Sequence, residues 1–80
     1  MRNPETREFM QKLYRLVEKY ENPPEVNTLD DSCEYFKYMI KDVSELYRQC
    51  GKNEFALRLI VAFCNAVDDR FKAVNKQLWA

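Results

Sequence analysis

Apolar residues crowd one stretch of the chain, residues 55–67. Eleven of its thirteen residues are apolar, and only Arg58 and Asn65 are not. Because a helix turns about 100° per residue, positions seven apart share a face, so these two residues form one narrow polar stripe. The pattern predicts a helix over 54–79. The centre of its buried face is formed by Ile60, Phe63 and Val67.

The apolar arc of this predicted helix is unusually wide. It spans about 260°, against the stripe of roughly 100° that is usual for a surface helix. One neighbouring helix covers the centre of the arc, and a second can cover only one of its two flanks. The other flank is therefore expected to need a partner. One flank consists of Leu57, Val61 and Cys64, and the other of Phe55, Leu59, Ala62 and Ala66.

Two further segments have the spacing of amphipathic helices. Residues 4–20 begin after Asn3 as N-cap, and residues 29–50 begin after Thr28 and end before Gly51, a residue that readily adopts the left-handed conformation of a helix end. The apolar face of the first contains Phe9, Leu13, Leu16, Val17 and Tyr20. That of the second contains Leu29, Cys33, Phe36, Ile40, Val43, Tyr47 and Cys50, widened by Met39 and Leu46.

The connections between the helices define the fold class. Residues 22–27, NPPEVN, end the first helix and form a short semi-rigid linker, because proline cannot continue a helix. The turn over 51–53, in which Asn53 can cap the last helix, is so short that the flanking helices must be antiparallel, with Phe36 opposite Val67. The sequence predicts one all-α domain over residues 1–80, a small three-helix bundle built on this long hairpin.

The segment around the turn, YRQCGKNEFAL, resembles the middle of a tetratricopeptide repeat. Gly51 stands in the turn and Ala56 at the small position of the second helix. The resemblance implies the same helix–turn–helix arrangement. The Trp, Leu-Gly and terminal Pro signals of the family are missing and no second copy follows at a period of 34, so no function is carried over.

Composition excludes several classes of function. With 46% hydrophobic and 32% charged residues the 80-residue chain is globular, and its single glycine argues against a β-rich fold. Lys+Arg and Asp+Glu both number 13, so no net field favours nucleic acid or an anionic membrane. The longest apolar run, residues 59–64, is too short for a membrane span, and the charged N-terminal segment does not resemble a secretory signal. A cytoplasmic location is expected.

The three cysteines, Cys33, Cys50 and Cys64, show no C-x-x-C spacing. Cys33 and Cys50 share one side of a helix but lie about 25 Å apart, too far for a disulfide. We expect all three to be buried free thiols, in agreement with a reducing compartment.

Few residues are available for catalysis. The chain has no histidine, and its one glycine cannot form a phosphate-binding loop. Two acidic pairs, at 30–31 and 68–69, fit helix starts and i,i+4 ion pairs better than a metal site. The basic residues Arg70, Lys72 and Lys76 could contact phosphate, but the neighbouring acids offset them. We therefore expect a protein that is not an enzyme and has no catalytic residue, metal or cofactor.

The wide apolar arc and several aromatic residues point to protein binding. Tyr38 faces away from the apolar side of its helix, Tyr14 lies at the edge of its own, and Trp79 falls near the Leu57 flank; Tyr and Trp are favoured interface anchors. The sequence predicts a non-catalytic domain that binds protein, most simply as a homodimer. The expected interface residues are Leu57, Val61, Cys64, Leu59, Ala62, Ala66, Tyr38 and Trp79.

Two alternatives remain open at this level. A small inhibitor or adaptor, for example from a mobile element or phage, could bind and block a larger host protein or enzyme, and the small size of the chain permits this. A dimeric nucleic-acid-associated regulator would need a basic surface that the sequence does not display.

Overall fold

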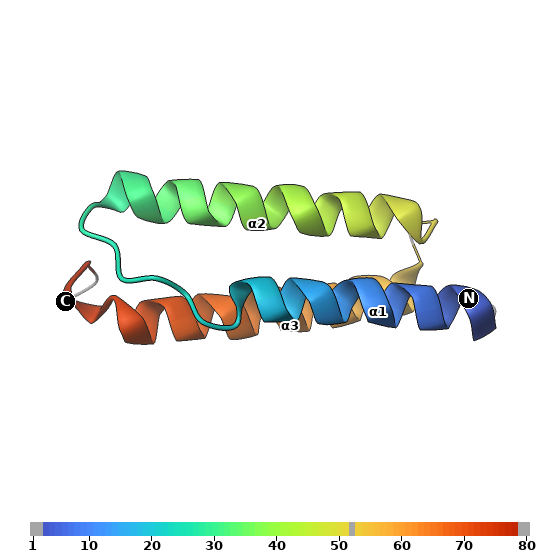
Figure 1. Cartoon of the computed structure of the whole chain (residues 1–80). Helices are drawn as coiled ribbons and strands as arrows, with labels where there is room; N and C mark the ends of the chain where they lie inside the picture. Colours follow the sequence, from blue (N-terminus) through green and yellow to red (C-terminus); the bar gives the residue numbers. More distant parts are fainter. Residues whose placement is uncertain (1–2, 52, 79–80) are drawn as a thin grey trace.

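Three helices lie side by side in the computed structural model, which describes residues 3–51 and 53–78, the side chains of residues 3 and 4 excepted (Figure 1). Helix α1 spans Asn3–Tyr20, α2 spans Leu29–Gln49 and α3 spans Glu54–Val74; a 3-10 turn, η1, follows at Lys76–Leu78. The described part contains no strand. The bundle measures 44 × 17 × 16 Å and has the predicted all-α architecture.

The hairpin of α2 and α3 forms as the turn residues predict. The Thr28 hydroxyl accepts a hydrogen bond from the Asp31 N–H at 3.2 Å, and the Asn53 side chain accepts one from the Ala56 N–H at 3.1 Å, so both helices are capped. Gly51 has a φ of 69°, the left-handed conformation that ends α2. The predicted cap of α1, the Asn3 side chain, lies outside the described residues.

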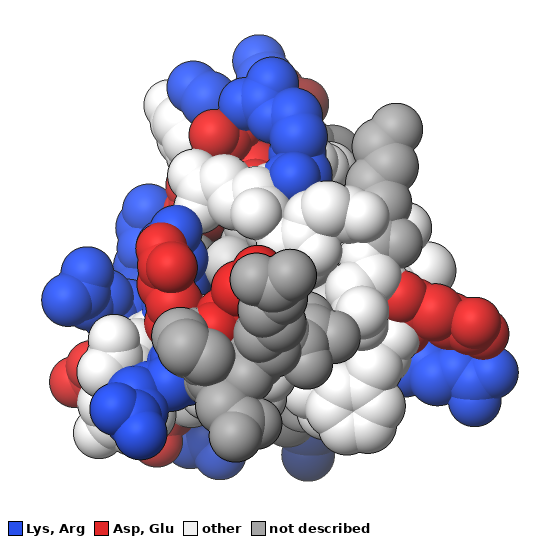
Figure 2. Space-filling model, turned by 90° about the vertical axis from the view of Figure 1, so that its right-hand side faces the viewer, with Lys and Arg blue, Asp and Glu red and all other residues white. Residues whose placement is uncertain are grey.

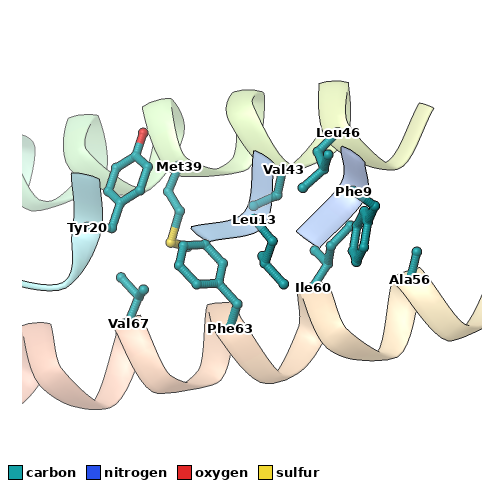
Figure 3. Close-up of a cluster of buried hydrophobic side chains, with 10 residues drawn as sticks. All are labelled: Phe9, Leu13, Tyr20, Met39, Val43, Leu46, Ala56, Ile60, Phe63 and Val67. Carbon is teal, nitrogen blue, oxygen red and sulfur yellow. The ribbon is translucent and has the colours of Figure 1, made fainter. Parts of the chain in front are cut away.

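The core is one layer of apolar side chains between the three helices (Figure 3). The predicted centre of the α3 face is correct, since Ile60, Phe63 and Val67 are all buried. Phe9, Leu13 and Tyr20 of α1 point into the same layer. From α2 come Met39, Val43 and Leu46.

The predicted apolar face of α2 is partly wrong. Leu29, Cys33 and Ile40 are exposed, and Ser32, which was not predicted on this face, is buried. Met39, Val43 and Leu46 are buried as predicted. The buried side is turned toward α1, because α1 packs on α2 as well as on α3. Phe36 packs against the core cluster that contains Val67, its predicted neighbour. Its ring also contacts Phe71, one turn further along α3, with centroids 4.9 Å apart.

Helix α3 ends earlier than the predicted residue 79. Its last residue is Val74, and Asn75 follows with 0% of its surface exposed. The Asn75 amide reaches the linker, where its oxygen accepts from the Val26 N–H at 2.7 Å and its nitrogen donates to the Pro24 carbonyl at 3.0 Å. These long-range bonds compete with a regular helical continuation. The chain therefore changes to the 3-10 turn.

The expectation of three buried thiols is also wrong. Cys33 is exposed, and Cys50 and Cys64 are half-buried. Cys33 lies on the edge of α2 that the other two helices leave uncovered. All three cysteines are free.

Candidate interaction surfaces

Helix α1 covers one flank of α3 only in part. At its C-terminal end the Arg70 side chain donates from Nε to the Glu21 carbonyl at 2.5 Å, which places α1 beside the Ala66 side of α3. An apolar groove of about 210 Å³ remains between the two helices. Its walls are formed by Val17, Glu21, Phe63, Ala66, Val67 and Arg70.

Exposed apolar side chains border this groove along both helices. On α1, Met10, Tyr14 and Val17 follow one another at spacings of four and three, so they share the side that faces the groove. Tyr14 is 63% exposed, and Phe55 at the start of α3 is 65% exposed. We call this surface the α1–α3 face. It consists of Met10, Tyr14, Val17, Phe55, Leu59, Ala62 and Ala66.

A second apolar surface lies on the opposite flank of α3. Leu57 and Val61 are exposed there, and Cys64 is half-buried. The contact of Phe36 with Phe71 places the uncovered edge of α2 beside this flank. A shallow depression along that edge is lined by Leu29, Ser32, Cys33, Phe36, Lys37 and Ile40. We call the surface the α2–α3 face; it comprises Leu29, Cys33, Phe36, Ile40, Leu57, Val61 and Cys64.

The polar stripe separates the two faces. Arg58 and Asn65 are exposed as predicted, and Arg58 forms an ion pair with Glu54 at 3.1 Å. Figure 2 views the bundle along its axis, with charged side chains gathered at the top and left and uncharged ones predominating right of the centre. Helix α3 lies on this right-hand side of Figure 2, because it lies behind α1 in Figure 1. Helix α3 thus contributes to two distinct apolar surfaces.

Of the remaining two predicted interface residues, only Tyr38 is described, and it joins neither surface. Tyr38 is exposed, but it lies one turn before Asp42, on the side of α2 that faces α1, and belongs to neither face. Trp79 lies outside the described residues. In their place the structure adds Met10, Tyr14 and Phe55 on one side of α3. On the other side it adds Leu29, Cys33, Phe36 and Ile40, which sequence spacing alone assigned to the core.

A charged cluster joins α1 to α2. The Asp42 carboxylate accepts from the Tyr20 hydroxyl at 2.5 Å and from Lys19 Nζ at 2.8 Å. Burial would raise the pKa of Asp42, but the hydrogen bonds from Lys19 and Tyr20 and the Lys19 charge lower it below its ordinary value. Burial, and then the bond to Asp42, raises the pKa of Tyr20 to about 12. The cluster is fully bonded and stabilises the packing of α1.

We expect Asp42→Asn to lower the free energy of unfolding by about 1 kcal/mol at pH 7, because a partly exposed ionic contact is lost. A carboxyl group whose pKa is lowered in the folded protein stabilises the fold at pH values above its ordinary pKa. This stabilisation is lost as the pH falls through the pKa of the folded state. The difference between wild type and variant should therefore close below about pH 4. Urea unfolding between pH 3 and pH 7 measures it, with Glu25→Gln in the exposed linker as control. A difference independent of pH would contradict the ionic role.

Two of the three basic residues considered for phosphate binding, Arg70 and Lys72, are engaged in contacts within the chain. Arg70 binds the end of α1, and Lys72 pairs with Asp68 at 3.1 Å. A cavity of about 270 Å³ between α1 and the end of α2 is likewise bordered by Lys12, which binds Glu8 at 3.0 Å and Gln49 at 2.7 Å. Within residues 3–51 and 53–78, no cluster of three or more His, Cys, Asp or Glu side chains could hold a metal ion.

Among the described helices, none combines the length and the apolar character needed to cross a membrane. Comparison of the chain with protein-family models, curated proteins and solved structures finds no significant match.

Proposed function

We propose that this protein is a non-catalytic protein-binding domain that self-associates as a homodimer through an apolar flank of α3. One observation carries the proposal: after two helices have packed against it, α3 still has exposed apolar side chains on both sides of its polar stripe. Val61 is 49% exposed on one side and Phe55 65% on the other. Apolar patches continuous across two helices are a common mark of protein interfaces.

A second copy of the chain is the simplest partner for such a face. A two-fold dimer buries the same patch on both copies, so one face is sufficient to form a closed assembly. The balance of 13 basic and 13 acidic residues means that two copies do not repel each other through net charge.

The dimensions of the molecule also permit this assembly. A standard interface takes about 800 Å² from each partner. The accessible surface of the monomer is 6009 Å², so such an interface would use roughly an eighth of it. One long side of a bundle 44 Å in length is large enough for this.

Light scattering across a concentration series, with a matched pair of variants, tests the proposal. Val61→Glu places a charge on the α2–α3 face and Ala62→Glu places one on the α1–α3 face; both residues are exposed neighbours on one helix. We expect the wild type to be dimeric and one of the two variants to be monomeric, because a desolvated glutamate in the interface costs several kcal/mol. A wild type that is monomeric throughout contradicts self-association. So do two folded variants that both keep the wild-type mass.

A further inference from the structure

The two apolar faces differ in the charges around them, and this difference selects one of them. Building on the proposed self-association, we infer that the dimer forms through the α1–α3 face, with the α1 helices of the two copies antiparallel and Tyr14 at the two-fold axis.

The charges along α1 carry this inference. Arg7, Tyr14 and Glu21 are spaced seven residues apart, so they lie on one stripe along the edge of the face. Arg7 and Glu21 are both exposed, and neither side chain forms an ion pair within the described residues. Each lies about 10 Å along the helix axis from Tyr14, one toward each end. The stripe therefore has opposite charges at equal distances from an exposed aromatic residue.

A two-fold axis through Tyr14 brings these opposite charges together at two places in the dimer. It makes α1 antiparallel to α1 of the second copy and places Arg7 of each copy opposite Glu21 of the other. Both charges gain a partner that the described residues of their own chain do not supply. A parallel arrangement would instead oppose Arg7 to Arg7 and Glu21 to Glu21, so electrostatics selects the antiparallel orientation.

The same axis brings complementary shapes of α3 together. Helices α1 and α3 run in the same direction (Figure 1), and Val17 and Glu21 of α1 line one groove with Ala66 and Arg70 of α3. Tyr14, one turn before Val17, is then level with Ala62, one turn before Ala66, and the axis passes beside Ala62. Reversal about this level places Phe55 of each copy opposite the 66–70 segment of the other. The apolar groove of about 210 Å³ between Val17, Ala66 and Arg70 lies there.

Small side chains on α3 allow the two copies to approach each other closely. Ala62 and Ala66 are exposed and add little bulk between the helices, so the Tyr14 rings and the Phe55 ring can insert beside them. Tyr14 and Phe55, each more than 60% exposed in the monomer, become the anchors of the interface.

The α2–α3 face lacks such an arrangement. Lys37 borders its depression, and Lys41 lies one turn further along the same helix. Both are exposed, and neither forms an ion pair within the described residues. A two-fold axis at Met39, the midpoint of α2, would oppose Lys37 to Lys41 of the second copy. Like charges in this position disfavour a symmetric dimer.

Charge reversal with complementation tests the inference. Arg7→Glu and Glu21→Arg are each expected to raise the dimer dissociation constant about tenfold, because two ion pairs become two repulsions. An equimolar mixture of the two variants should regain the wild-type constant to within about threefold, since the heterodimer again opposes acid to base at both contacts. The double variant R7E/E21R should regain it alone. Sedimentation equilibrium measures all four species, and circular dichroism confirms that they are folded.

A cysteine placed on the axis gives an independent measurement. In a Cys33→Ser background, Tyr14→Cys should form an intermolecular disulfide on mild oxidation, because the two positions face each other across the axis. Tyr38→Cys in the same background is the matched control, since Tyr38 is equally an exposed tyrosine but lies on neither face. Crosslinking of both positions at the same rate would contradict the arrangement.

The outcomes separate this inference from the proposed function. A monomeric wild type overturns both. A dimeric wild type whose single variants retain its dissociation constant, or whose mixture is not rescued, overturns the antiparallel α1–α3 arrangement and leaves self-association standing. In that case Val61→Glu identifies the other face.

Discussion

Replacing Phe71 by alanine is expected to lower the free energy of unfolding by about 3–5 kcal/mol, the range for deleting a large core aromatic side chain. Phe71 has 0% of its surface exposed. Its ring stacks on Tyr35 with centroids 4.8 Å apart and meets Phe36 edge-on at 4.9 Å. Alanine would leave a cavity among these rings and remove their attractive contacts.

The loss should spread beyond α3, because this aromatic group connects all three helices. Tyr35 also packs edge-on against Tyr20, at 5.5 Å, and its hydroxyl donates to the Tyr20 carbonyl at the end of α1. We therefore expect unfolding to remain a single transition that moves to lower urea concentration, followed by circular dichroism. A second, earlier transition confined to α1 would contradict this coupling.

The control for this variant is Tyr38→Ala, which removes an exposed aromatic side chain that belongs to neither apolar face. Its expected effect is within about 0.5 kcal/mol of zero. A Phe71→Ala variant that is no less stable than this control would show that the ring does not hold the helices together.

The helices themselves could be predicted from the sequence, because their signals are local. Thr28 and Asn53 cap the helices that follow them, and Gly51 has the left-handed conformation that the turn needs. The centre of the α3 face was also predictable, since eleven apolar residues in thirteen leave only one polar stripe. Local spacing is sufficient where one side of a helix is unambiguous.

The buried side of α2 could not be predicted in this way. Two overlapping sets of positions share Phe36 and Val43 and have nearly the same periodicity. One set continues through Leu29, Cys33 and Ile40, and the other through Ser32, Met39 and Leu46. The choice depends on where α1 packs, and α1 is joined by a linker whose path the sequence does not specify. Its position follows from contacts distant in sequence, such as Lys19 with Asp42.

Because the position of α1 could not be predicted, the expected interface residues differ from those that the structure places on the two apolar faces. The width of the α3 arc indicated an uncovered flank, but it could not assign neighbours to either side. Once α1 is placed, Met10 and Tyr14 join one flank, and the misassigned edge of α2 joins the other. Pairs such as Arg7 and Glu21 become informative only then, since their meaning depends on the face that they border.

The second large effect concerns Asn75, which lies within the helix predicted over 54–79. Asn75→Leu is expected to lower the free energy of unfolding by about 2–4 kcal/mol. Leucine has the same branching and the same number of side-chain heavy atoms but leaves the Val26 N–H and the Pro24 carbonyl without the partners that they have at 2.7 and 3.0 Å. The linker would lose its attachment to α3, and α1 would pack less firmly as a result.

Asn75→Asp keeps the size of the side chain and changes only its hydrogen bonding, so it isolates the contribution of the hydrogen bonds. A carboxylate can still accept from Val26, but it cannot donate to Pro24 or to the Phe71 carbonyl at 3.1 Å, so three oxygens come together in a buried site. The fold then disfavours the ionised form, and the folded-state pKa of the new carboxyl rises. Stability should be lowest near pH 7 and should increase as pH falls below the folded value, the reverse of the trend at Asp42.

Urea unfolding at pH 4 and pH 7 measures this difference, with Asn65→Asp on the exposed polar stripe as control. The control should change stability by less than about 0.5 kcal/mol at either pH. If Asn75→Asp matched it, the bonds that the Asn75 amide nitrogen donates would not be needed to hold the linker. If the predicted trend is observed, a single buried amide fixes both the end of α3 and the path of the linker. That path places α1 on one flank of α3, so Asn75 would also determine which apolar side chains of α3 remain exposed.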